Sequence, residues 1–397
     1  MIKKITDKFQ RITTNQLYLP EIDGIRFLAI VLVILFHTHG YFIGKSSVHF
    51  TDDPKRYGLL NTFLMHGDFG VELFFVLSGF ILCLPFAHHY INKGKEISLK
   101  KYYLRRLTRL EPPYFIAITL IFILQLISKI NPISILLPHS LASFIYAHDL
   151  IYHRTPLLTV VAWSLEIEIQ FYVFAPFLFR LLSLHIIVRR IMLIFLIVLF
   201  ISLQIIYPPA FLSIYGFIQY FLTGILLADF YVSNAAAKFF RQKWMLLLAT
   251  ACLVTIMYLP LKDSYVSANF VLVARFSFPF ILCLFYCIIL KNSRVKKIFS
   301  YKFVPIIGGM CYSIYLLHYT IISLFGRYTM KWRITDYYLP NLFLQIILLG
   351  IPVLVISSVF YLYVEKPFMS NRWMDMLLKK NKKAVEINTV AEMDRDK

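Results

Sequence analysis

The sequence predicts an all-α, polytopic membrane protein, and three observations support this fold class. Hydrophobic residues make up 59% of the 397 residues and charged residues 16%, against roughly 45–50% and about 25% in ordinary globular proteins. The mean hydropathy is +0.69. The apolar residues also gather into runs of about 20 residues, the length that crosses a bilayer core as a helix. These properties exclude a soluble enzyme, a disordered chain and a water-soluble nucleic-acid binder.

Ten apolar runs are candidate transmembrane helices, and they form one unit between two tails. We expect residues 1–20 to be a cytoplasmic tail, residues 21–368 the transmembrane unit, and residues 369–397 a partly disordered cytoplasmic tail. The region 132–147 is apolar but short and contains Pro138, so it is predicted to be re-entrant or interfacial. The predicted spans are 22–43, 69–90, 112–128, 161–179, 191–207, 211–231, 244–261, 270–290, 304–325 and 342–364.

Basic residues predict on which side of the membrane each loop lies. The formal net charge is +20, and 30 Lys and Arg residues fall in one set of alternate loops and tails against 9 in the other. Because cytoplasmic loops carry the excess of Lys and Arg, both termini are predicted to be cytoplasmic. Here the basic residues serve to hold loops at the anionic membrane face. We therefore expect a multi-pass protein of the cell membrane that contacts the lipid bilayer and no nucleic acid.

Cysteine and histidine spacing predicts no metal site. The five cysteines all lie within apolar runs and lack the spacing of metal ligands or of a disulfide framework. We interpret them as packing residues. His37 and His39 stand at i, i+2 and point to different faces of a helix, so they do not form a metal-ligand pair.

Two ionisable residues occupy the first predicted span, and such groups within lipid are functional candidates because they are costly there. Arg26 and His37 are eleven residues apart. This spacing is three helical turns plus roughly 20°, so both side chains face the same way about 16 Å apart along the axis. The simpler alternatives are an arginine that snorkels to the interface and a histidine hydrogen-bonded in the core.

Two further spans carry polar side chains in apolar surroundings. The second span contains Glu72 and the pair Ser78-Gly79, which allows another backbone to approach; the pair either belongs to a site or simply packs a helix. In the fourth span, Ser164 and Glu168 lie on one helical face together with Tyr172, and Glu166 and Gln170 lie on another. These residues either line a site or mark the membrane interface. Trp163 precedes them.

Arg106 and Arg109 lie at i, i+3 in the first predicted cytoplasmic loop, on one face of a short helix expected to end at Pro112 and Pro113. Paired guanidinium groups suit a phosphate, which they bind in bidentate fashion. The alternative is an ordinary basic loop on the cytoplasmic side.

The ninth span places His318 at the depth of two other ionisable groups. On the predicted topology, His318 and Glu168 lie about 12 Å below the outer end of their spans and His37 about 9 Å below its own. Three ionisable groups from three spans at one depth predict a shared cavity. Tyr315 lies three residues before His318.

These motifs together resemble the integral-membrane acyltransferase 3 family. They occur in family order from residue 21 to residue 368, and the ordered set is far more specific than any single motif. The matching stretches are Asp23-Gly-Ile-Arg26 followed by His37, Gly70-Val-Glu72-Leu-Phe-Phe-Val-Leu-Ser78-Gly-Phe, Arg106-x-x-Arg109, Trp163-Ser-Leu-x-x-Glu168-x-Gln-Phe-Tyr172, Tyr312-Ser-Ile-Tyr-Leu-Leu-His318 and Glu365-Lys-Pro-Phe.

The resemblance implies ten transmembrane helices and transfer of an acyl group, usually acetyl, from acyl-coenzyme A. The implied acceptor is a hydroxyl group of a surface polysaccharide or of a lipid-linked glycan. By family analogy His37 is the essential catalytic residue, Arg26 its partner, and Arg106 with Arg109 the contacts to coenzyme A. We expect further substrate contacts from Ser78, Trp163, Ser164, Tyr315 and His318.

Two chemical routes and two other functions stay open at this point. His37 could act as general base on the acceptor hydroxyl, oriented by Glu168 or Glu72, or it could carry the acyl group as a relay. A transporter or flippase also fits ten spans with buried charges, although no paired interrupted helices indicate inverted repeats. An acyltransferase acting on a small molecule is the other alternative.

Overall fold

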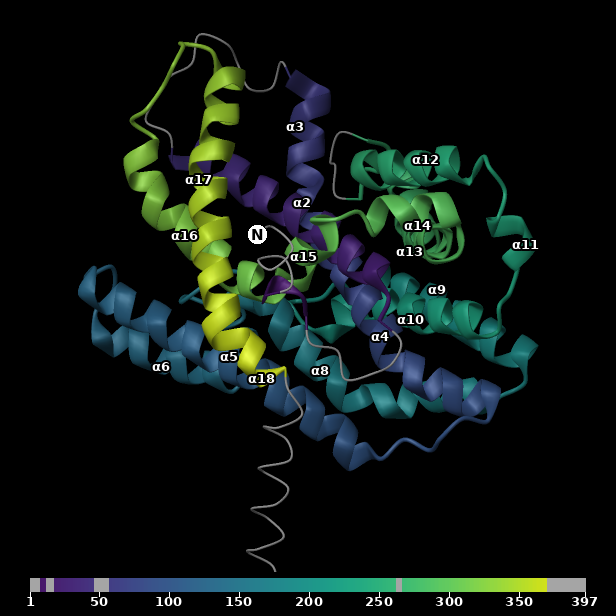
Figure 1. Cartoon of the computed structure of the whole chain (residues 1–397). Coiled ribbons are helices and arrows are strands. Elements are labelled where there is room, and N and C mark those ends of the chain that lie inside the picture. Colours follow the sequence, from purple (N-terminus) through teal and green to yellow (C-terminus); the bar gives the residue numbers. More distant parts are fainter. Residues whose placement is uncertain (1–7, 12–17, 46–56, 262–265, 370–397) are drawn as a thin grey trace, which may run out of the picture.

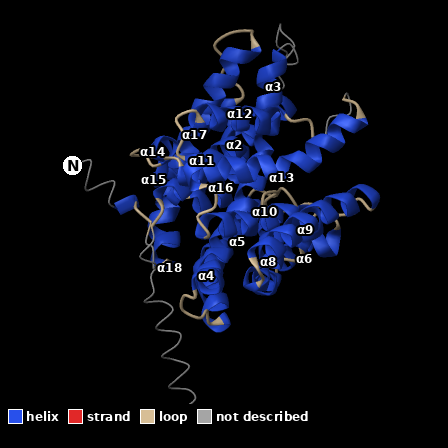
Figure 2. Ribbon diagram, turned by 90° about the vertical axis from the view of Figure 1, so that its right-hand side faces the viewer, coloured by secondary structure: helices blue, strands red, loops and turns tan. Residues whose placement is uncertain are grey.

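The computed structural model describes residues 8–11, 18–45, 57–261 and 266–369, and within these ranges it contains helices and no strand (Figures 1 and 2). Almost all of the predicted C-terminal tail therefore lies outside the described residues. The main helices are α2 (Pro20–Lys45), α3 (Gly58–Met65), α4 (Gly70–Asn92), α5 (Leu99–Ile127), α6 (Ile133–Phe144), α7 (His148–Tyr152), α8 (Ala162–Phe179), α9 (Ile186–Ile206), α10 (Ile214–Val232), α11 (Ala237–Phe240), α12 (Met245–Tyr258), α13 (Ala268–Lys291), α14 (Ser293–Phe299), α15 (Val304–Gly309), α16 (Cys311–Thr329), α17 (Tyr338–Phe360) and α18 (Lys366–Phe368).

The described part of the chain has seven helical segments long and apolar enough to cross a membrane. The remaining three predicted spans are helical too: they correspond to α8, to the shorter apolar α12, and to α15 followed by α16. The protein is thus an all-α membrane protein, whereas ten spans and cytoplasmic termini stay predictions. The seven segments are Pro20–Lys45, Gly58–Asn92, Leu99–Ile127, Ile186–Ile206, Ile214–Val232, Ala268–Lys291 and Tyr338–Phe368.

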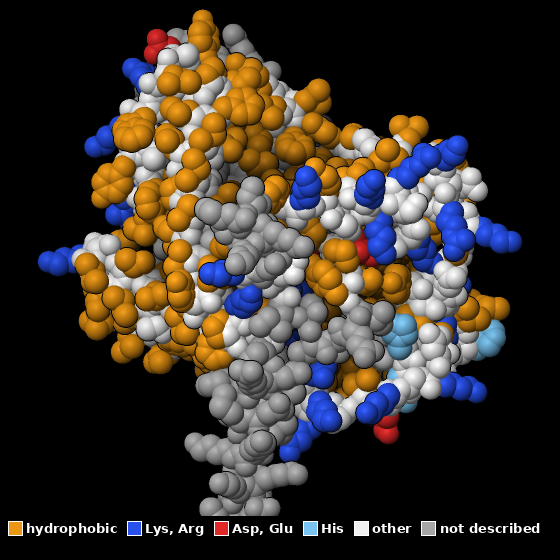
Figure 3. Space-filling model, in the orientation of Figure 1, with side chains coloured by type: hydrophobic (Ala, Val, Ile, Leu, Met, Phe, Trp, Pro, Cys, Tyr) orange, Lys and Arg blue, Asp and Glu red, His pale blue; other side chains and the backbone are white. Residues whose placement is uncertain are grey.

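A lipid-facing stripe runs along α17. Five large apolar side chains, spaced four residues apart, are each more than half exposed. This spacing forms a stripe that winds slowly around the helix, by about 40° at each step, and a continuous apolar surface of this kind is unfavourable in water but suits the bilayer core. Figure 3 shows mostly hydrophobic side chains on the part of the surface where α17 lies, with most Lys and Arg on the right and lower parts of the view. The five are Phe343, Ile347, Ile351, Val355 and Val359.

Helices α4 and α10 cross at two glycines. A Cβ atom on Gly79 would overlap the backbone at Phe221, and a Cβ atom on Gly224 would overlap the backbone at Val76. Small residues at such a crossing let two helix backbones approach closely. The expectation that Ser78-Gly79 admits a neighbouring backbone is therefore confirmed. The crossing also fixes α4, which carries Ser78.

Helix α5 corrects one expectation, because it continues through Pro112 and Pro113 instead of ending before them. Pro112 and Pro113 lack the N–H groups that would bond to the carbonyls of Thr108 and Arg109 in the preceding turn, and α5 continues without these two bonds. The Tyr312 hydroxyl donates to the nearby carbonyl of Leu110 at 2.9 Å. The arginine-bearing segment and the third predicted span thus form one helix, which begins at an N-cap provided by Ser98.

Helices α6 and α7 connect α5 to α8, and histidines cluster where they meet. His139 Nδ1 lies 2.8 Å from His148 Nε2, and Arg154 donates to His139 Nε2 at 2.9 Å. The backbone N–H of Asp149 donates to Glu166 at 2.9 Å. This network anchors the region 132–147, which forms the helix α6, to the start of α8.

Candidate active site

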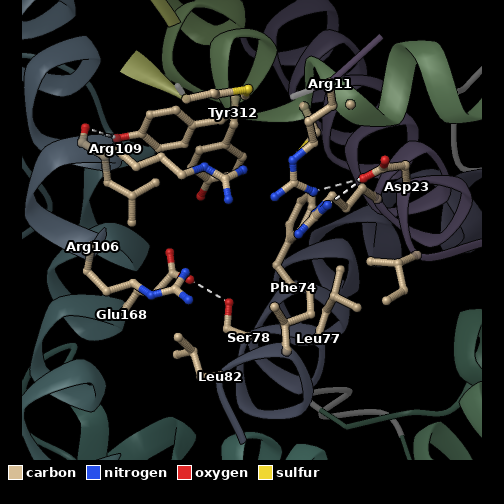
Figure 4. A pocket seen from close by; sticks show the side chains of 18 of the residues that line it. Arg11, Asp23, Phe74, Leu77, Ser78, Leu82, Arg106, Arg109, Glu168 and Tyr312 are labelled. Atoms are coloured by element: carbon tan, nitrogen blue, oxygen red, sulfur yellow. Dashed lines mark hydrogen bonds and ion pairs between the residues drawn. The ribbon is translucent and has the colours of Figure 1, made fainter. Parts of the chain in front are cut away.

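One cavity gathers most of the residues that the sequence singles out. It has a volume of about 340 Å³ and lies between α2, α4, α5, α8 and α16. Pockets that hold small ligands span roughly 300–1,000 Å³. Figure 4 shows side chains from these helices pointing into it. The predicted site residues that line the cavity are Arg26, Ser78, Arg106, Arg109, Ser164, Glu168 and Tyr315.

On the α2 side, one carboxylate holds two guanidinium groups. Asp23 accepts from Arg26, one helical turn further along α2, and from Arg11 at 3.1 Å. The Asp23 side chain is 2% exposed, whereas those of Arg11 and Arg26 are 11% and 13% exposed. Arg26 is therefore held by an ion pair at the cavity wall, which replaces the alternative of a free arginine that snorkels to the interface.

On the α5 side, Arg106 and Arg109 both line the cavity, as their i, i+3 spacing predicts. Arg105 lines it as well. In Figure 4 the side chains of Arg106 and Arg109 come from the side opposite Arg11, and the space between them is the cavity. The cavity lining as a whole contains five guanidinium groups and three carboxylates. These are Arg11, Arg26, Arg105, Arg106 and Arg109 against Asp23, Glu168 and Glu365.

Ser78 and Glu168 connect α4 to α8. The Ser78 hydroxyl donates to the Glu168 carboxylate at 2.5 Å. Tyr172, one turn after Glu168, also lines the cavity. The predicted face of α8 is thus confirmed, because Glu166 and Gln170 point elsewhere and accept from the backbone N–H groups of other segments, Asp149 and Ile214.

Ser164 and Tyr315 lie on another part of the cavity wall, bonded to each other. The Tyr315 hydroxyl is 2.6 Å from Ser164 Oγ and donates to the carbonyl of Val161 at 3.1 Å. The Tyr315 ring also contacts His318, with ring centroids 5.7 Å apart. His318 does not line the cavity. Tyr315 therefore connects the cavity wall to the histidine on the next turn of α16.

His318 and His37 form a pair outside the cavity lining. Their ring centroids are 5.2 Å apart. His318 Nδ1 lies 3.1 Å and 2.8 Å from the carbonyl oxygens of Ile314 and Tyr315, so it must be the protonated nitrogen that donates. In the neutral ring Nε2 is then the unprotonated nitrogen; it is buried and has no hydrogen-bond partner among the described residues. Two imidazoles from α2 and α16 thus face the same small region.

The structure separates groups that the depth estimate placed together. Glu168 lines the cavity and binds Ser78, whereas His37 contacts His318 and the Tyr319 ring. The estimate used only the rise along each helix, and it carries no information on lateral position. No contact among the described residues supports the expectation that Glu168 orients His37.

Glu72 and Trp163 do not line the cavity. Glu72 is buried near the start of α4. Trp163 packs against Phe217 with ring centroids 5.2 Å apart. Their predicted roles as orienting and substrate-binding residues stay predictions.

Sequence reasoning missed part of the cavity wall. Arg11 belongs to the segment expected to be a tail, and no periodic pattern connects it to the spans. Glu365 accepts from the backbone N–H and the hydroxyl of Ser313 at 3.0 and 2.5 Å. These bonds join the helical turn that follows α17 to α16. The Glu365-Lys-Pro-Phe motif could have indicated it. Tyr312, also in a noted motif, lines the same wall.

The family model of an acyltransferase domain matches residues 19–362. The chain belongs to the acyltransferase 3 family. The match covers α2, α4, α5, α8 and α16, which form most of the cavity, whereas Arg11 precedes the match and Glu365 follows it.

Relatives of this acyltransferase 3 chain include named O-acetyltransferases. The peptidoglycan O-acetyltransferase OatA of Listeria monocytogenes is 27% identical over 90% of the chain and 57% of its own length. A putative O-acetyltransferase of Staphylococcus aureus strain COL is 27% identical over 88% and 57%. The O-acetyltransferase OatA of S. aureus strain MRSA252 is 25% identical over 94% and 61%. The chain thus spans less than two thirds of these relatives, and no solved structure matches it.

Proposed function

We propose that this protein is a membrane O-acetyltransferase that moves an acetyl group from acetyl-coenzyme A to a hydroxyl group of a cell-surface glycan. The observation that carries the proposal is the cavity with five guanidinium groups, close to a pair of imidazoles on α2 and α16. The acyltransferase family match and the O-acetyltransferase relatives support the reaction type.

The donor end of the site is assigned from charge. Coenzyme A carries phosphate groups, and guanidinium groups bind phosphate in bidentate fashion. Arg106 and Arg109 project from one face of α5 toward the cavity, and Arg26 on α2 lines the same cavity. In this proposal the phosphates bind among these arginines, and the thioester arm extends toward Tyr315 and the imidazole pair.

The catalytic step is assigned to His37. As general base, one ring nitrogen accepts the proton of the acceptor hydroxyl while that oxygen attacks the thioester carbonyl. The C–S bond breaks, the coenzyme A thiolate leaves, and it takes the proton from the imidazolium. In the relay route, His37 first attacks the thioester and then passes the acetyl group to the hydroxyl. Both routes yield an ester and free coenzyme A.

His318 is the neighbour that would serve His37. Because its Nδ1 donates to backbone carbonyls, its unprotonated Nε2 can accept a hydrogen bond from His37 directly or through water. Such a bond would fix the tautomer of His37 that accepts the hydroxyl proton. This replaces the carboxylate orienter expected from the sequence with an imidazole.

The acceptor is proposed from the relatives. One of them is named for acetylation of peptidoglycan, so we propose a glycan of the cell surface, free or lipid-linked. Mass spectrometry of the surface glycan from cells with and without the gene tests this directly. A mass difference of one acetyl unit that disappears on deletion supports the proposal, and identical spectra contradict it.

A membrane assay with labelled acetyl-coenzyme A separates the enzyme from a carrier. Transfer of label to glycan should require the intact chain, and His37→Ala should abolish it while the protein still accumulates in the membrane. Arg106→Ala should raise KM for the donor, whereas Arg180→Ala, at an exposed arginine, should not. Uptake of a solute without covalent label would instead indicate a transporter or flippase, and label on a soluble small molecule would change the acceptor class.

A further inference from the structure

Arg11 lies outside the family match yet belongs to the wall of the family cavity. The match begins at residue 19, and Arg11 precedes it in the chain. Its side chain is nonetheless 11% exposed and lines the cavity beside Arg26. A basic residue of an ordinary cytoplasmic tail would extend into water, because burial of a guanidinium group is costly without a compensating partner. The position of Arg11 therefore needs an explanation.

Two contacts fix the short segment that carries Arg11. The Arg11 guanidinium donates to Asp23 on α2 at 3.1 Å. Three residues earlier, the Lys8 carbonyl accepts from the side chain of Lys366 on α18. The segment is thus attached to both the first and the last described helices, and this attachment directs Arg11 into the cavity instead of away from it.

The Asp23 carboxylate does not satisfy Arg11. One oxygen of Asp23 accepts from both Arg11 and Arg26, so two positive charges share one negative charge. The Arg11 Nε–H is buried and has no acceptor among the described residues, although an unpaired buried donor is costly. The Nε–H of Arg106, across the cavity, is also buried without an acceptor in the described part of the chain.

We propose that Arg11 binds a phosphate group of the acyl-coenzyme A donor. A phosphate supplies the missing acceptor for Nε–H and the missing negative charge, and the fork of an arginine matches its oxygens. This inference rests on the proposed function and extends it, because it adds a donor contact from outside the family domain. Arg11 and Arg106 then hold the phosphates from opposite sides.

A purely structural role is the competing explanation. In that case Arg11 only neutralises Asp23 and thereby orients Arg26. The two roles differ in one measurable property, because a phosphate contact contributes to binding only when the donor carries that phosphate. We therefore compare acetyl-coenzyme A with acetyl-3′-dephospho-coenzyme A and with S-acetyl-4′-phosphopantetheine, using the full chain in nanodiscs.

Arg11→Ala should raise KM for acetyl-coenzyme A about tenfold or more with kcat nearly unchanged, since a hydrogen bond to a charged group is worth about 1.5–3 kcal/mol and about 1.4 kcal/mol is tenfold. The wild type should prefer the donor that carries more phosphate groups, and Arg11→Ala should lose part of this preference. The pair of donors between which the preference is lost identifies the phosphate that Arg11 binds. Arg11→Lys, which keeps the charge without the Nε–H, should fall between. Lys8→Ala, a matched loss of charge at an exposed side chain, should behave as wild type.

A wild-type KM in Arg11→Ala would overturn the inference. A lower kcat or melting temperature with an unchanged donor preference would also overturn it, because Arg11 would then only neutralise Asp23. If the alanine variant fails to accumulate, Arg11→Lys provides the same comparison. If the wild type transfers no acetyl group, the proposed function fails by itself. Binding of coenzyme A to the purified protein then decides the inference, which requires weaker binding in Arg11→Ala and is overturned by equal binding.

Discussion

The imidazole rings of His37 and His318 lie 5.2 Å apart, centroid to centroid, on helices α2 and α16. Two hydrogen bonds from His318 Nδ1 to the backbone of its own helix fix its tautomer and leave Nε2 as an acceptor. Because the tautomer is set by the backbone, it does not depend on a substrate. The pair is therefore prepared to handle a proton before substrates bind.

His318→Asn tests this pair. The amide of asparagine can keep the donation to the carbonyls of Ile314 and Tyr315, but it lacks a group in the place of Nε2. We expect kcat for acetyl transfer to fall about 100-fold, the lower end of what general acid–base groups contribute, with KM for the donor within about twofold. The pH profile of kcat should also change.

His153→Asn is the control for that substitution. His153 is exposed and has a φ of 50°, a conformation that asparagine tolerates well, so this variant should retain activity. Full activity of His318→Asn, or a fall in kcat that parallels a fall in melting temperature, would show that His318 only packs α16.

The Ser78–Glu168 bond is the second test. Its removal by Ser78→Ala should lower the free energy of unfolding by about 1.5–3 kcal/mol, because the bond joins a hydroxyl to a carboxylate. Glu168→Gln keeps an acceptor oxygen and should cost less. In a double-mutant cycle read from thermal unfolding in detergent, the two substitutions should be clearly non-additive. Additive effects would mean that the 2.5 Å contact contributes little.

Helical periodicity predicted the parts of the site that lie on one helix. Ser164 and Glu168 share a face of α8, and Arg106 and Arg109 share a face of α5, because a spacing of three or four residues fixes direction within a helix. The same rule could not place His37 relative to Glu168, since lateral position depends on how helices pack. It also treated Pro112 as a helix end, although α5 continues through it to Ile127.

Arg11 and Glu365 show what a local pattern cannot reveal. Arg11 reaches the cavity through contacts with Asp23 and α18, which are tertiary and leave no periodic signal near residue 11. Glu365 follows a long apolar run and was recognisable only as part of a motif. The ordered set of motifs predicted the family, which the match over residues 19–362 confirms.

The crossing of α4 and α10 provides a stability test. Gly79→Ala places a methyl group against the backbone of Phe221, and overpacking of this kind typically costs about 1–3 kcal/mol. We expect a lower melting temperature and less accumulated protein. Gly350→Ala is the matched control, because nothing lies within 4 Å of a Cβ atom there, and it should melt as the wild type does. Equal melting temperatures for both variants would contradict the close crossing.

The connection between α6 and α8 lies outside the spans and contains two titratable side chains, His148 and Asp149. They should make the melting temperature depend on pH in opposite directions. Burial and the neighbouring His139 lower the pKa of His148 from 6.5 to about 4. Burial raises the pKa of Asp149 from 3.8 to about 6. Arg154 and Glu166 are the other charged groups that contact this network.

The signs of the two contributions follow from proton binding. Between about pH 6.5 and 4 the unfolded His148 takes up a proton that the folded one refuses, so acidification destabilises the fold. Between about pH 6 and 3.8 the folded Asp149 takes up a proton before the unfolded one, so acidification stabilises it. In the wild type the two effects largely offset each other. Asp149→Asn should therefore lose melting temperature more steeply than the wild type from pH 7 to 4, and His148→Gln should lose it less steeply. Parallel curves for the three proteins would show that neither group is coupled to folding.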